Sequence, residues 1–214
     1  MWDFIAQERT DILYSSYQHV LLVVQCVALA SVLAFVLAVL VTRVSWLEGV
    51  ANAISAIGLT LPSFALLGLL LPVLGIGPGP SVAAVTFYAV LPILRNAVVG
   101  LQGVDATLLE SARGMGMNPV ATLVRVQLPL AWPVILAGIR TSTQMSMGVA
   151  AIAAIVLGPG LGSYIYSGLE QIGSANALYS ALVGTVGVVL LALVLDALLQ
   201  LFGRVTTSKG IRVS

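Results

Sequence analysis

The chain has 214 residues, of which 59% are hydrophobic and 8% are charged, and its formal net charge is +1. Ordinary globular domains carry about 25% charged residues, so this composition excludes a soluble protein with a charged exterior and predicts an integral membrane protein. The near-neutral charge gives no sign of a nucleic-acid partner, and the single cysteine, Cys26, excludes a disulfide framework and a cysteine metal site.

Residues 1–19 are more polar than the sequence that follows, and we expect them to form a segment outside the membrane. They do not combine a basic region, an apolar core and a small-residue cleavage site, so we expect no removable signal peptide. The only histidine, His19, stands at the start of an apolar run. We interpret it as a residue of the membrane interface rather than as a metal ligand.

Long apolar windows dominate the remaining sequence. A helix needs about 20 apolar residues to cross about 30 Å of hydrocarbon. Five windows meet this requirement, so the predicted fold is an all-α membrane protein, a bundle of five spanning helices within residues 20–202, followed by a tail at residues 203–214. The windows are Val20–Val41, Val50–Leu71, Ser81–Val104, Leu130–Leu157 and Ala177–Phe202.

Two prolines fall inside predicted spans, Pro62 in the second and Pro92 in the third. Each removes a backbone donor and tends to kink its helix, which lipid tolerates where neighbouring helices or a wet cavity satisfy the freed carbonyl. The sequence leaves two interpretations open: packing inside the bundle, or a bend beside a transport pathway.

The stretch at about residues 105–129, between the third and fourth windows, is too polar and too broken to cross a bilayer. Asp105 is a candidate cap for a short helix over residues 106–113. Gly114 or Gly116 is a candidate end of that helix.

A second short helix is predicted in the same stretch, because Asn118 followed by Pro119 is a strong start signal. In this helix Val120, Leu123 and Val124 fall on one face at helical spacing. Two short helices with a hinge and an apolar face, placed between membrane spans, predict a docking surface.

The fourth window contains a cation. Arg140 and Gln144 lie one helical turn apart, with Thr141 beside them, about 15 Å from the start of the window at about 1.5 Å per residue. A cation at that depth costs at least a few kcal/mol unless it is paired or hydrated, so it is expected to face the bundle interior or water. Two interpretations stay open: this polar face lines a substrate path or gate, or Arg140 neutralises a carboxylate or caps carbonyls of a neighbouring helix. Asp196 in the fifth window is expected to be solvated at the helix end or paired with a basic neighbour.

Basic residues determine the predicted orientation. Those on one side of the membrane are Arg43, Arg113, Arg125, Arg204, Lys209 and Arg212. On the other side, Arg9 is the one firmly placed. By the positive-inside rule, the 105–129 stretch and the C-terminus are cytoplasmic, and the N-terminus is outside.

The cytoplasmic stretch resembles a known motif. It contains Glu110, Ser111 and Ala112, then Gly116, then Val126, Leu128 and Pro129. Membrane subunits of ATP-binding-cassette (ABC) importers have a cytoplasmic loop with the pattern E-A-A, three residues, G, nine residues, I, one residue, L-P. Only Ser111 for alanine and Val126 for isoleucine depart from it, and both replacements are small.

The resemblance extends over nearly the whole chain. The segments SARGMGMNP, LPLAWPVILAGIRTST and LPILRN are similar to the short permeases of osmoprotectant importers, which carry glycine betaine, carnitine, choline or related compounds. The segment Gly158–Gly162 departs from the fuller glycine run that is frequent in that family, which bears on the solute and not on the transporter class. With such solutes, Tyr88 in the third window is a candidate to offer its ring to a passing quaternary ammonium, although bundle packing is the commoner role of such an aromatic residue.

The resemblance implies a type I ABC importer permease in the bacterial cytoplasmic (inner) membrane. Two such subunits, identical or paired with a homologue, are expected to work with two cytoplasmic ATPase subunits, an extracytoplasmic solute-binding protein and the surrounding membrane lipid. Glu110 is implied to help fix the bent shape of a loop that fits a groove on the ATPase. ATP and Mg²⁺ are then bound by the ATPase. This chain has no G-x-x-x-x-G-K-[ST] segment and is expected to be a transport subunit without a cofactor, a metal or an enzymatic activity.

The sequence leaves three other functions open: an ABC importer for an amino acid, a secondary carrier or channel driven by an ion gradient, and a membrane scaffold that transports nothing. A secondary carrier usually shows ionisable residues near mid-membrane and internal repeats. Apart from Arg140, this sequence offers little of either. A scaffold does not need the hinged loop, and co-purification with an ATPase separates the importers from both other classes.

Overall fold

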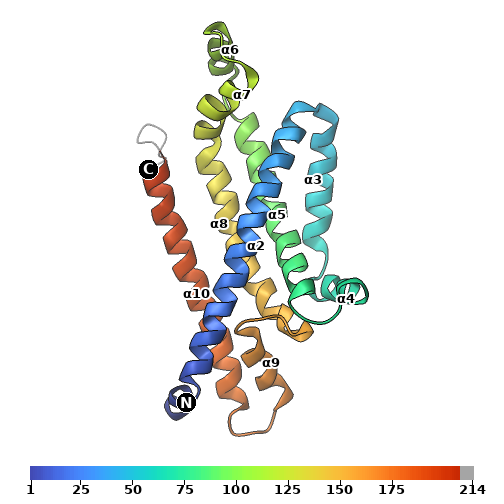
Figure 1. Ribbon diagram of the computed structural model, residues 1–214, viewed down its shortest axis with the longest axis vertical. Helices are drawn as coiled ribbons and strands as arrows, with labels where there is room; N and C mark the ends of the chain where they lie inside the picture. The colour runs from blue at the N-terminus through green and yellow to red at the C-terminus, as the bar shows by residue number, and fades with distance from the viewer. Residues whose placement is uncertain (208–214) are drawn as a thin grey trace.

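The computed structural model describes residues 1–207, which form helices joined by short connections. The elements are α1 (Trp2–Gln7), α2 (Arg9–Arg43), α3 (Ser45–Thr60), α4 (Ser63–Leu74), α5 (Pro78–Gln102), α6 (Ala106–Gly114), α7 (Pro119–Thr122), the π-helical turn η1 (Leu123–Gln127), α8 (Leu128–Ile152), the 3₁₀ turn η2 (Ala153–Val156), α9 (Gly162–Glu170) and α10 (Ala177–Thr206). The long helices run along the long axis of the molecule (Figure 1). The short helices α6 and α7 lie at one end, and α1 and α9 lie at the other.

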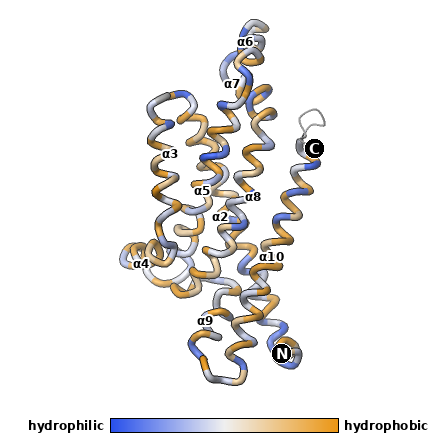
Figure 2. Tube along the Cα trace, turned by 180° about the vertical axis from the view of Figure 1, so that it is seen from behind, coloured by the Kyte–Doolittle hydropathy of each residue, from blue (hydrophilic) through white to orange (hydrophobic). Residues whose placement is uncertain are grey.

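Four stretches of the described residues are long and apolar enough to cross a membrane: α2, α5, Pro119–Val156 and α10. They correspond to four of the five predicted windows, and apolar residues follow one another along most of their length (Figure 2). Two of these helices extend past the predicted ends, since α2 begins at Arg9 and α10 continues to Thr206. The rest of the predicted tail, residues 208–214 with Lys209 and Arg212, lies outside the described residues.

The second window contains two helices, α3 and α4, with a break at Pro62 where the sequence predicted a kink. Together they are long and apolar enough to form a fifth, broken span or a re-entrant loop. The chain turns by 97° between α3 and α4, at Leu61 and Pro62. Both residues have extended backbone, with ψ of 129° and 128°. A residue that precedes proline avoids the helical conformation, and proline cannot donate to the helix before it, so two residues are enough to end α3 and start α4 in a new direction.

A carbonyl freed at this break finds a partner on another helix. The Tyr88 hydroxyl of α5 donates to the Leu61 carbonyl oxygen at 2.6 Å, and the tyrosine side chain is buried, 3% exposed. In lipid such a carbonyl needs a protein or water partner, so Tyr88 helps to make the break tolerable. The ring itself packs edge-on against Phe87, with the ring centroids 5.4 Å apart.

Helices α2, α5 and α8 form the centre of the bundle. On α2, the fully buried residues Ala30, Ala34 and Ala38 repeat every fourth position, which keeps one face narrow enough for close helix approach. Between α5 and α8 the approach is closer still, because a Cβ at Gly138 would lie 2.6 Å from the Asn96 Cβ. The three helices therefore form one closely packed unit.

His19 packs against other helices of the bundle, and its place at the membrane interface stays a prediction. Because α2 starts at Arg9, the histidine falls inside the bundle, where it is fully buried. Its Nε2 donates to the Met147 carbonyl oxygen of α8 at 3.1 Å, and Gly160 packs against the ring. It is thus a packing residue that joins α2 to α8.

The role of Tyr88 at the break predicts a loss of stability when its hydroxyl is removed. Tyr88→Phe leaves the Leu61 carbonyl without this donor, which we expect to cost about 1–3 kcal/mol. The thermal midpoint of the purified protein in detergent should fall by about 2–4 °C for each kcal/mol. The exposed Tyr14 provides the control, since Tyr14→Phe should leave the midpoint unchanged. Equal midpoints for the two variants would contradict the role given to Tyr88.

Candidate functional site

The stretch from Asp105 to Pro129 projects beyond the bundle at one end of the molecule (Figure 1). Its first helix, α6, starts as predicted. The Asp105 carboxylate accepts a hydrogen bond from the Thr107 backbone N–H at 2.8 Å, and this bond lowers the pKa of Asp105 below its ordinary value. The cap stays charged at neutral pH and satisfies one of the unpaired donors of the first turn.

The helix ends in a glycine turn. Gly116 has a φ of +80°, a conformation that residues with side chains rarely adopt. Its N–H donates to the Arg113 carbonyl oxygen at 2.9 Å, and the Met117 N–H reaches back to the Ala112 carbonyl oxygen at 3.1 Å. This pair of bonds is the Schellman closure, so Gly116 makes the reversal, and Gly114 is the last residue of the helix.

The second start was also predicted correctly, but the helix that follows was not. The Asn118 side chain accepts from the Ala121 N–H at 2.8 Å, with Pro119 in the first turn. Instead of a separate short helix, α7 continues through η1 into α8. Pro129 has no N–H for the carbonyl of Arg125, and the wider π turn lies directly before it. The stretch is therefore continuous with the spanning helix α8.

Apolar side chains are exposed on this projection. We define the apolar tip as Leu108, Met115, Val120 and Val124, which are 47%, 71%, 68% and 54% exposed. The predicted apolar face is thus divided, because Leu123 packs towards the core while its two neighbours on that face point outward. Apolar side chains exposed together in this way suit an interaction surface.

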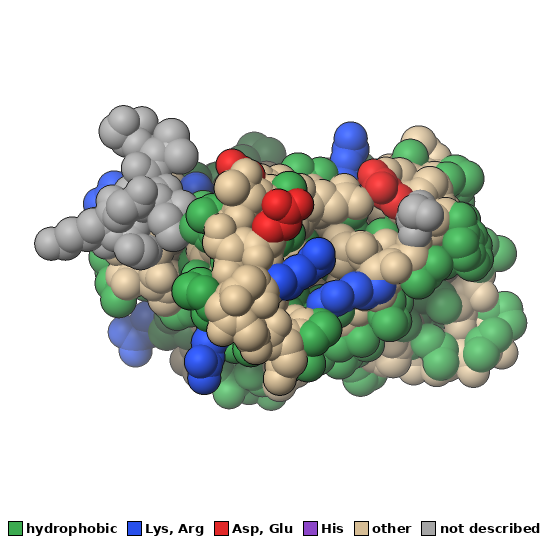
Figure 3. Space-filling view, turned by 90° about the horizontal axis from the view of Figure 1, so that it is seen from above, with side chains coloured by type: hydrophobic (Ala, Val, Ile, Leu, Met, Phe, Trp, Pro, Cys, Tyr) green, Lys and Arg blue, Asp and Glu red, His purple; other side chains and the backbone are tan. Residues whose placement is uncertain are grey.

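Charged side chains are found at the same end of the molecule as the tip. Seen from this end, the molecule presents both Lys or Arg and Asp or Glu side chains among apolar ones (Figure 3). A cavity of about 170 Å³ lies under the projection, with Arg43, Arg113 and Gln127 among its lining residues. Arg43 belongs to the end of α2, so the projection lies close to the cytoplasmic end predicted for the first span. From the sequence, Arg43 and Arg113 indicated only the orientation of the chain in the membrane.

The seven motif residues lie at different places in this projection. Ala112 is buried at the end of α6, Gly116 makes the turn, and the Ser111 hydroxyl donates to the Thr107 carbonyl oxygen at 2.8 Å. Val126, Leu128 and Pro129 lie where η1 passes into α8. Glu110 is exposed, and its side chain makes no hydrogen bond or ion pair within residues 1–207. Asp105, Gly116 and Asn118 hold the shape of the projection, so a part for Glu110 in that shape stays a prediction.

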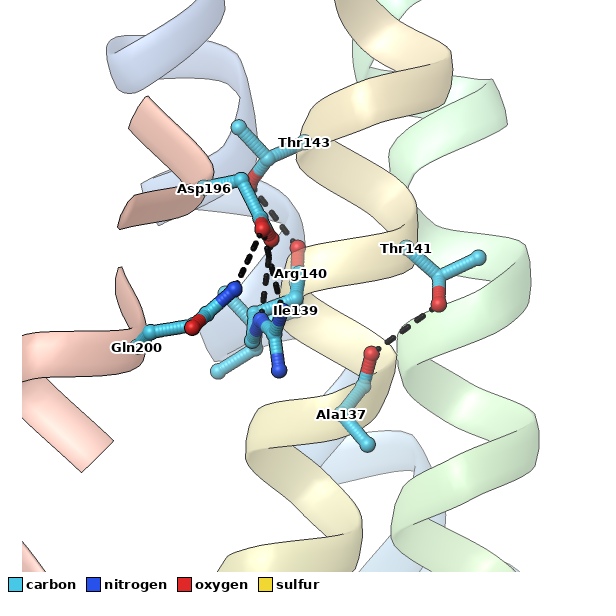
Figure 4. A network of polar contacts seen from close by, with 7 residues as sticks. All are labelled: Ala137, Ile139, Arg140, Thr141, Thr143, Asp196 and Gln200. Carbon is cyan, nitrogen blue, oxygen red and sulfur yellow. Dashed lines mark hydrogen bonds and ion pairs between the residues drawn. The ribbon is translucent and has the colours of Figure 1, made fainter. Parts of the chain in front are cut away.

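Arg140 is paired. Its Nε donates to one oxygen of Asp196 on α10 at 2.9 Å, and its Nη2 donates to the other at 3.0 Å (Figure 4). Gln200, one turn further along α10, adds a third bond to the carboxylate at 2.8 Å. The exposed fractions are 35% for the Arg140 side chain and 14% for Asp196. The interpretation that Arg140 neutralises a carboxylate is confirmed, and so is a basic partner for Asp196.

The four predicted path residues lie in different surroundings. Thr141 is exposed and points away from Arg140, with its hydroxyl bonded to the Ala137 carbonyl oxygen at 3.1 Å (Figure 4). Gln144 is exposed one turn beyond Arg140, towards Asp196. Tyr88 is buried beneath the break between α3 and α4. A role of these residues in a translocation path stays a prediction.

Comparison with known proteins gives one consistent result. Residues 27–207 match the family model described as "binding-protein-dependent transport system inner membrane component". The chain is 41% identical over 212 residues to the choline transport system permease protein OpuBB of Bacillus subtilis, covering 98% of this chain and 94% of that one. It is 40% identical over 202 residues to the osmoprotectant import permease protein OsmW of Salmonella typhimurium, covering 92% of each.

A solved structure has the same fold. A chain of the MetNI methionine ABC transporter, in an inward-facing conformation, superposes with a TM-score of 0.75 at 22% identity, over 94% of this chain and 96% of that one. At this identity the likeness concerns the arrangement of helices alone. It agrees with the predicted type I permease bundle.

The Arg140–Asp196 pair predicts a particular pattern of stabilities. Arg140→Leu leaves a carboxylate unpaired in the membrane, which we expect to lower the thermal midpoint by about 4–8 °C, equivalent to about 2 kcal/mol. The double variant Arg140→Leu with Asp196→Leu removes both charges and should regain most of that loss. A double variant as unstable as the single one would contradict a pairing role. If the face around Arg140 lines a substrate path, the stable double variant should fold but should not transport. Measuring uptake by this variant tests that interpretation.

Proposed function

The chain belongs to the family of inner-membrane components of binding-protein-dependent transport systems, and from this membership we propose that it is the permease subunit of an ATP-driven importer for a compatible solute. The observation that carries the proposal is identity along almost the whole chain. Besides the choline permease, the glycine betaine/carnitine/choline permease OpuCB of Bacillus subtilis is 38% identical over 99% of this chain and 96% of its own. Choline, glycine betaine and carnitine are therefore the proposed solutes.

The proposed assembly has two permease subunits, which form the pathway, and two cytoplasmic ATPase subunits. An extracytoplasmic binding protein delivers the solute. The apolar tip and the charged side chains at the same end of the molecule support the ATPase contact, because a helical projection with exposed apolar side chains fits a groove on a partner. The subunit composition of the purified assembly distinguishes an identical second permease subunit from a homologue.

The projection is built to transmit movement. Caps at Asp105 and Asn118 and the turn at Gly116 hold its two helices in one shape, and η1 joins it to α8 without a break. Because α8 packs closely on α5 and is tied to α10 by the Arg140–Asp196 pair, a displacement of the projection carries these helices with it. Closure of the ATPase subunits on ATP would then tilt the helices between inward and outward access.

The orientation follows the distribution of basic residues. With the projection bound to a cytoplasmic ATPase, α1 and α9 lie at the extracytoplasmic end, and the described part of the chain ends on the cytoplasmic side. The arginines Arg43, Arg113 and Arg125 then all face the cytoplasm, as the positive-inside rule requires. The proposed location is the bacterial cytoplasmic (inner) membrane.

Uptake by the purified assembly tests the proposed function. Proteoliposomes that contain the permease, its ATPase and its binding protein should accumulate choline, glycine betaine or carnitine only when ATP is supplied inside. Methionine serves as the control solute, because the methionine transporter shares the fold at low identity, and it should not accumulate. Accumulation of the solute by the permease without its ATPase would identify a secondary carrier instead.

The glycine turn of the projection predicts a variant that is inserted but uncoupled. Gly116→Leu forces a side chain into a left-handed conformation, at a cost of about 1–2 kcal/mol, although no atom lies within 4 Å of the new Cβ. We expect normal amounts in the membrane and about tenfold lower ATP-dependent uptake, because the strain favours other shapes of the turn over the native one, and about 1.4 kcal/mol changes such a population ratio tenfold. Gly114→Leu is the matched control, with equal space around its Cβ and an ordinary helical backbone. Uptake by Gly116→Leu at the wild-type rate would count against the proposal that the projection transmits movement.

A further inference from the structure

A cavity of about 470 Å³ opens at the end of the molecule opposite to the projection. It lies where α1 and the start of α2 meet α9 and the start of α10, so two parts of the chain that are far apart in the sequence form it (Figure 1). Its walls combine the aromatic residues Phe4 and Tyr164, the carboxylate Glu8, and the amides and hydroxyls of residues such as Asn176 and Ser15. This volume falls within the range of about 300–1,000 Å³ that is usual for small-molecule sites.

The charge of this cavity comes from one side chain. Among the described residues that line it, Glu8 is the one with a formal charge at neutral pH. Glu8 stands at the corner between α1 and α2, and its Oε2 accepts a hydrogen bond from the Tyr164 hydroxyl at 3.2 Å. Asp11, in the first turn of α2, adds negative charge near the same hydroxyl. An anionic ligand is therefore disfavoured here, and a cation is favoured.

The walls are held in place before any ligand arrives. Burial and the nearby charge of Glu8 raise the pKa of Tyr164 to about 12, so its hydroxyl stays protonated and keeps donating at neutral pH. The Ser180 hydroxyl of α10 donates to the Tyr164 carbonyl oxygen at 2.8 Å, which ties α9 to α10. Phe4 packs against Tyr179 with the ring centroids 6.4 Å apart. Such preorganisation lowers the entropic cost of binding.

Two aromatic walls and one carboxylate match a particular kind of cation. An ammonium or guanidinium group needs hydrogen-bond acceptors for its N–H groups, whereas a quaternary ammonium has none to satisfy. It binds through aromatic faces and a nearby negative charge. A carboxylate on the same ligand would meet Glu8 in a cavity of this size, and a hydroxyl would find the amide and hydroxyl groups of the wall.

We propose that this cavity binds a quaternary ammonium group that carries no carboxylate, with Glu8 as the counter-charge and with Phe4 and Tyr164 as walls. The proposal rests on the proposed function, because the solutes named there include such a cation. It adds a site on the permease itself, at the mouth of the bundle and separate from the delivering binding protein. It also assigns the site a preference for choline over glycine betaine, whose carboxylate would face Glu8.

The test is a binding measurement without the binding protein. The permease with its ATPase is placed in nanodiscs of phosphatidylethanolamine and phosphatidylglycerol, neither of which has a quaternary ammonium group, and radiolabelled choline is titrated. We expect saturable binding that tetramethylammonium displaces and that glycine betaine displaces at least about tenfold more weakly. In nanodiscs that contain phosphatidylcholine, displacement of choline would show that a lipid headgroup shares the site, and unchanged binding would show that the free solute alone occupies it. Both results support the quaternary ammonium assignment.

Matched variants make the test specific. Glu8→Gln keeps the length and an acceptor oxygen for Tyr164 but removes the charge, and it should weaken choline binding about tenfold; Phe4→Leu should weaken it about fivefold. Glu170→Gln, an exposed carboxylate of α9 outside the cavity wall, should leave it unchanged. Thermal midpoints equal to that of the wild type confirm that the variants fold.

Two results would overturn the proposal: no saturable choline binding by the folded assembly, or binding that Glu8→Gln leaves unchanged. These failures are distinct from a failure of the proposed function. If the complete assembly imports choline but the permease binds none, the cavity assignment is wrong and the importer stands. If the permease binds tetramethylammonium through Glu8 but the complete assembly imports no compatible solute, the cavity assignment stands and the importer is wrong.

Discussion

The fixed shape of the projection between α5 and α8 is the constraint on which the rest of the structure depends. Polar backbone at both helix starts and at the turn is satisfied locally, by Asp105, Asn118 and the two bonds around Gly116. These bonds lie within the projection itself, while Leu123 anchors it on the core of the bundle. A rigid projection with an apolar tip can be displaced by a partner that binds it. Because the projection is continuous with α8, this displacement is transmitted to the membrane helices.

Inside the membrane the governing constraint is that polar groups need partners. The break after α3 is satisfied by the Tyr88 hydroxyl, and the charge of Arg140 is satisfied by Asp196. Each contact joins two helices, so the polar groups that lipid would penalise also fix how α3 lies on α5 and how α10 lies on α8. His19 does the same between α2 and α8. The bundle is held by few polar contacts set into extensive apolar packing.

Local features of the structure could be predicted from the sequence, and contacts between distant segments could not. Apolar runs located the spanning helices, and cap residues located both starts in the projection, because these signals act within a few residues. The 97° turn at Pro62 could not be told from a kink, since the partner of its freed carbonyl lies on α5. The sequence predicted a basic partner as one possibility for Asp196, but it did not identify Arg140 as that partner. The cavity lined by Glu8 and Tyr164 could not be predicted from the sequence, because these two residues are 156 positions apart.

The central claim, that an external motor drives this bundle through a cytoplasmic projection, is tested most directly at the apolar tip. Val120→Cys in a Cys26→Ala background places one thiol on the tip, where the native side chain is 68% exposed. A membrane-impermeant maleimide should label it in inside-out vesicles and not in right-side-out vesicles, and bound ATPase should block the labelling. Labelling from the outer side, or labelling from the inner side that the ATPase leaves unchanged, would contradict the account.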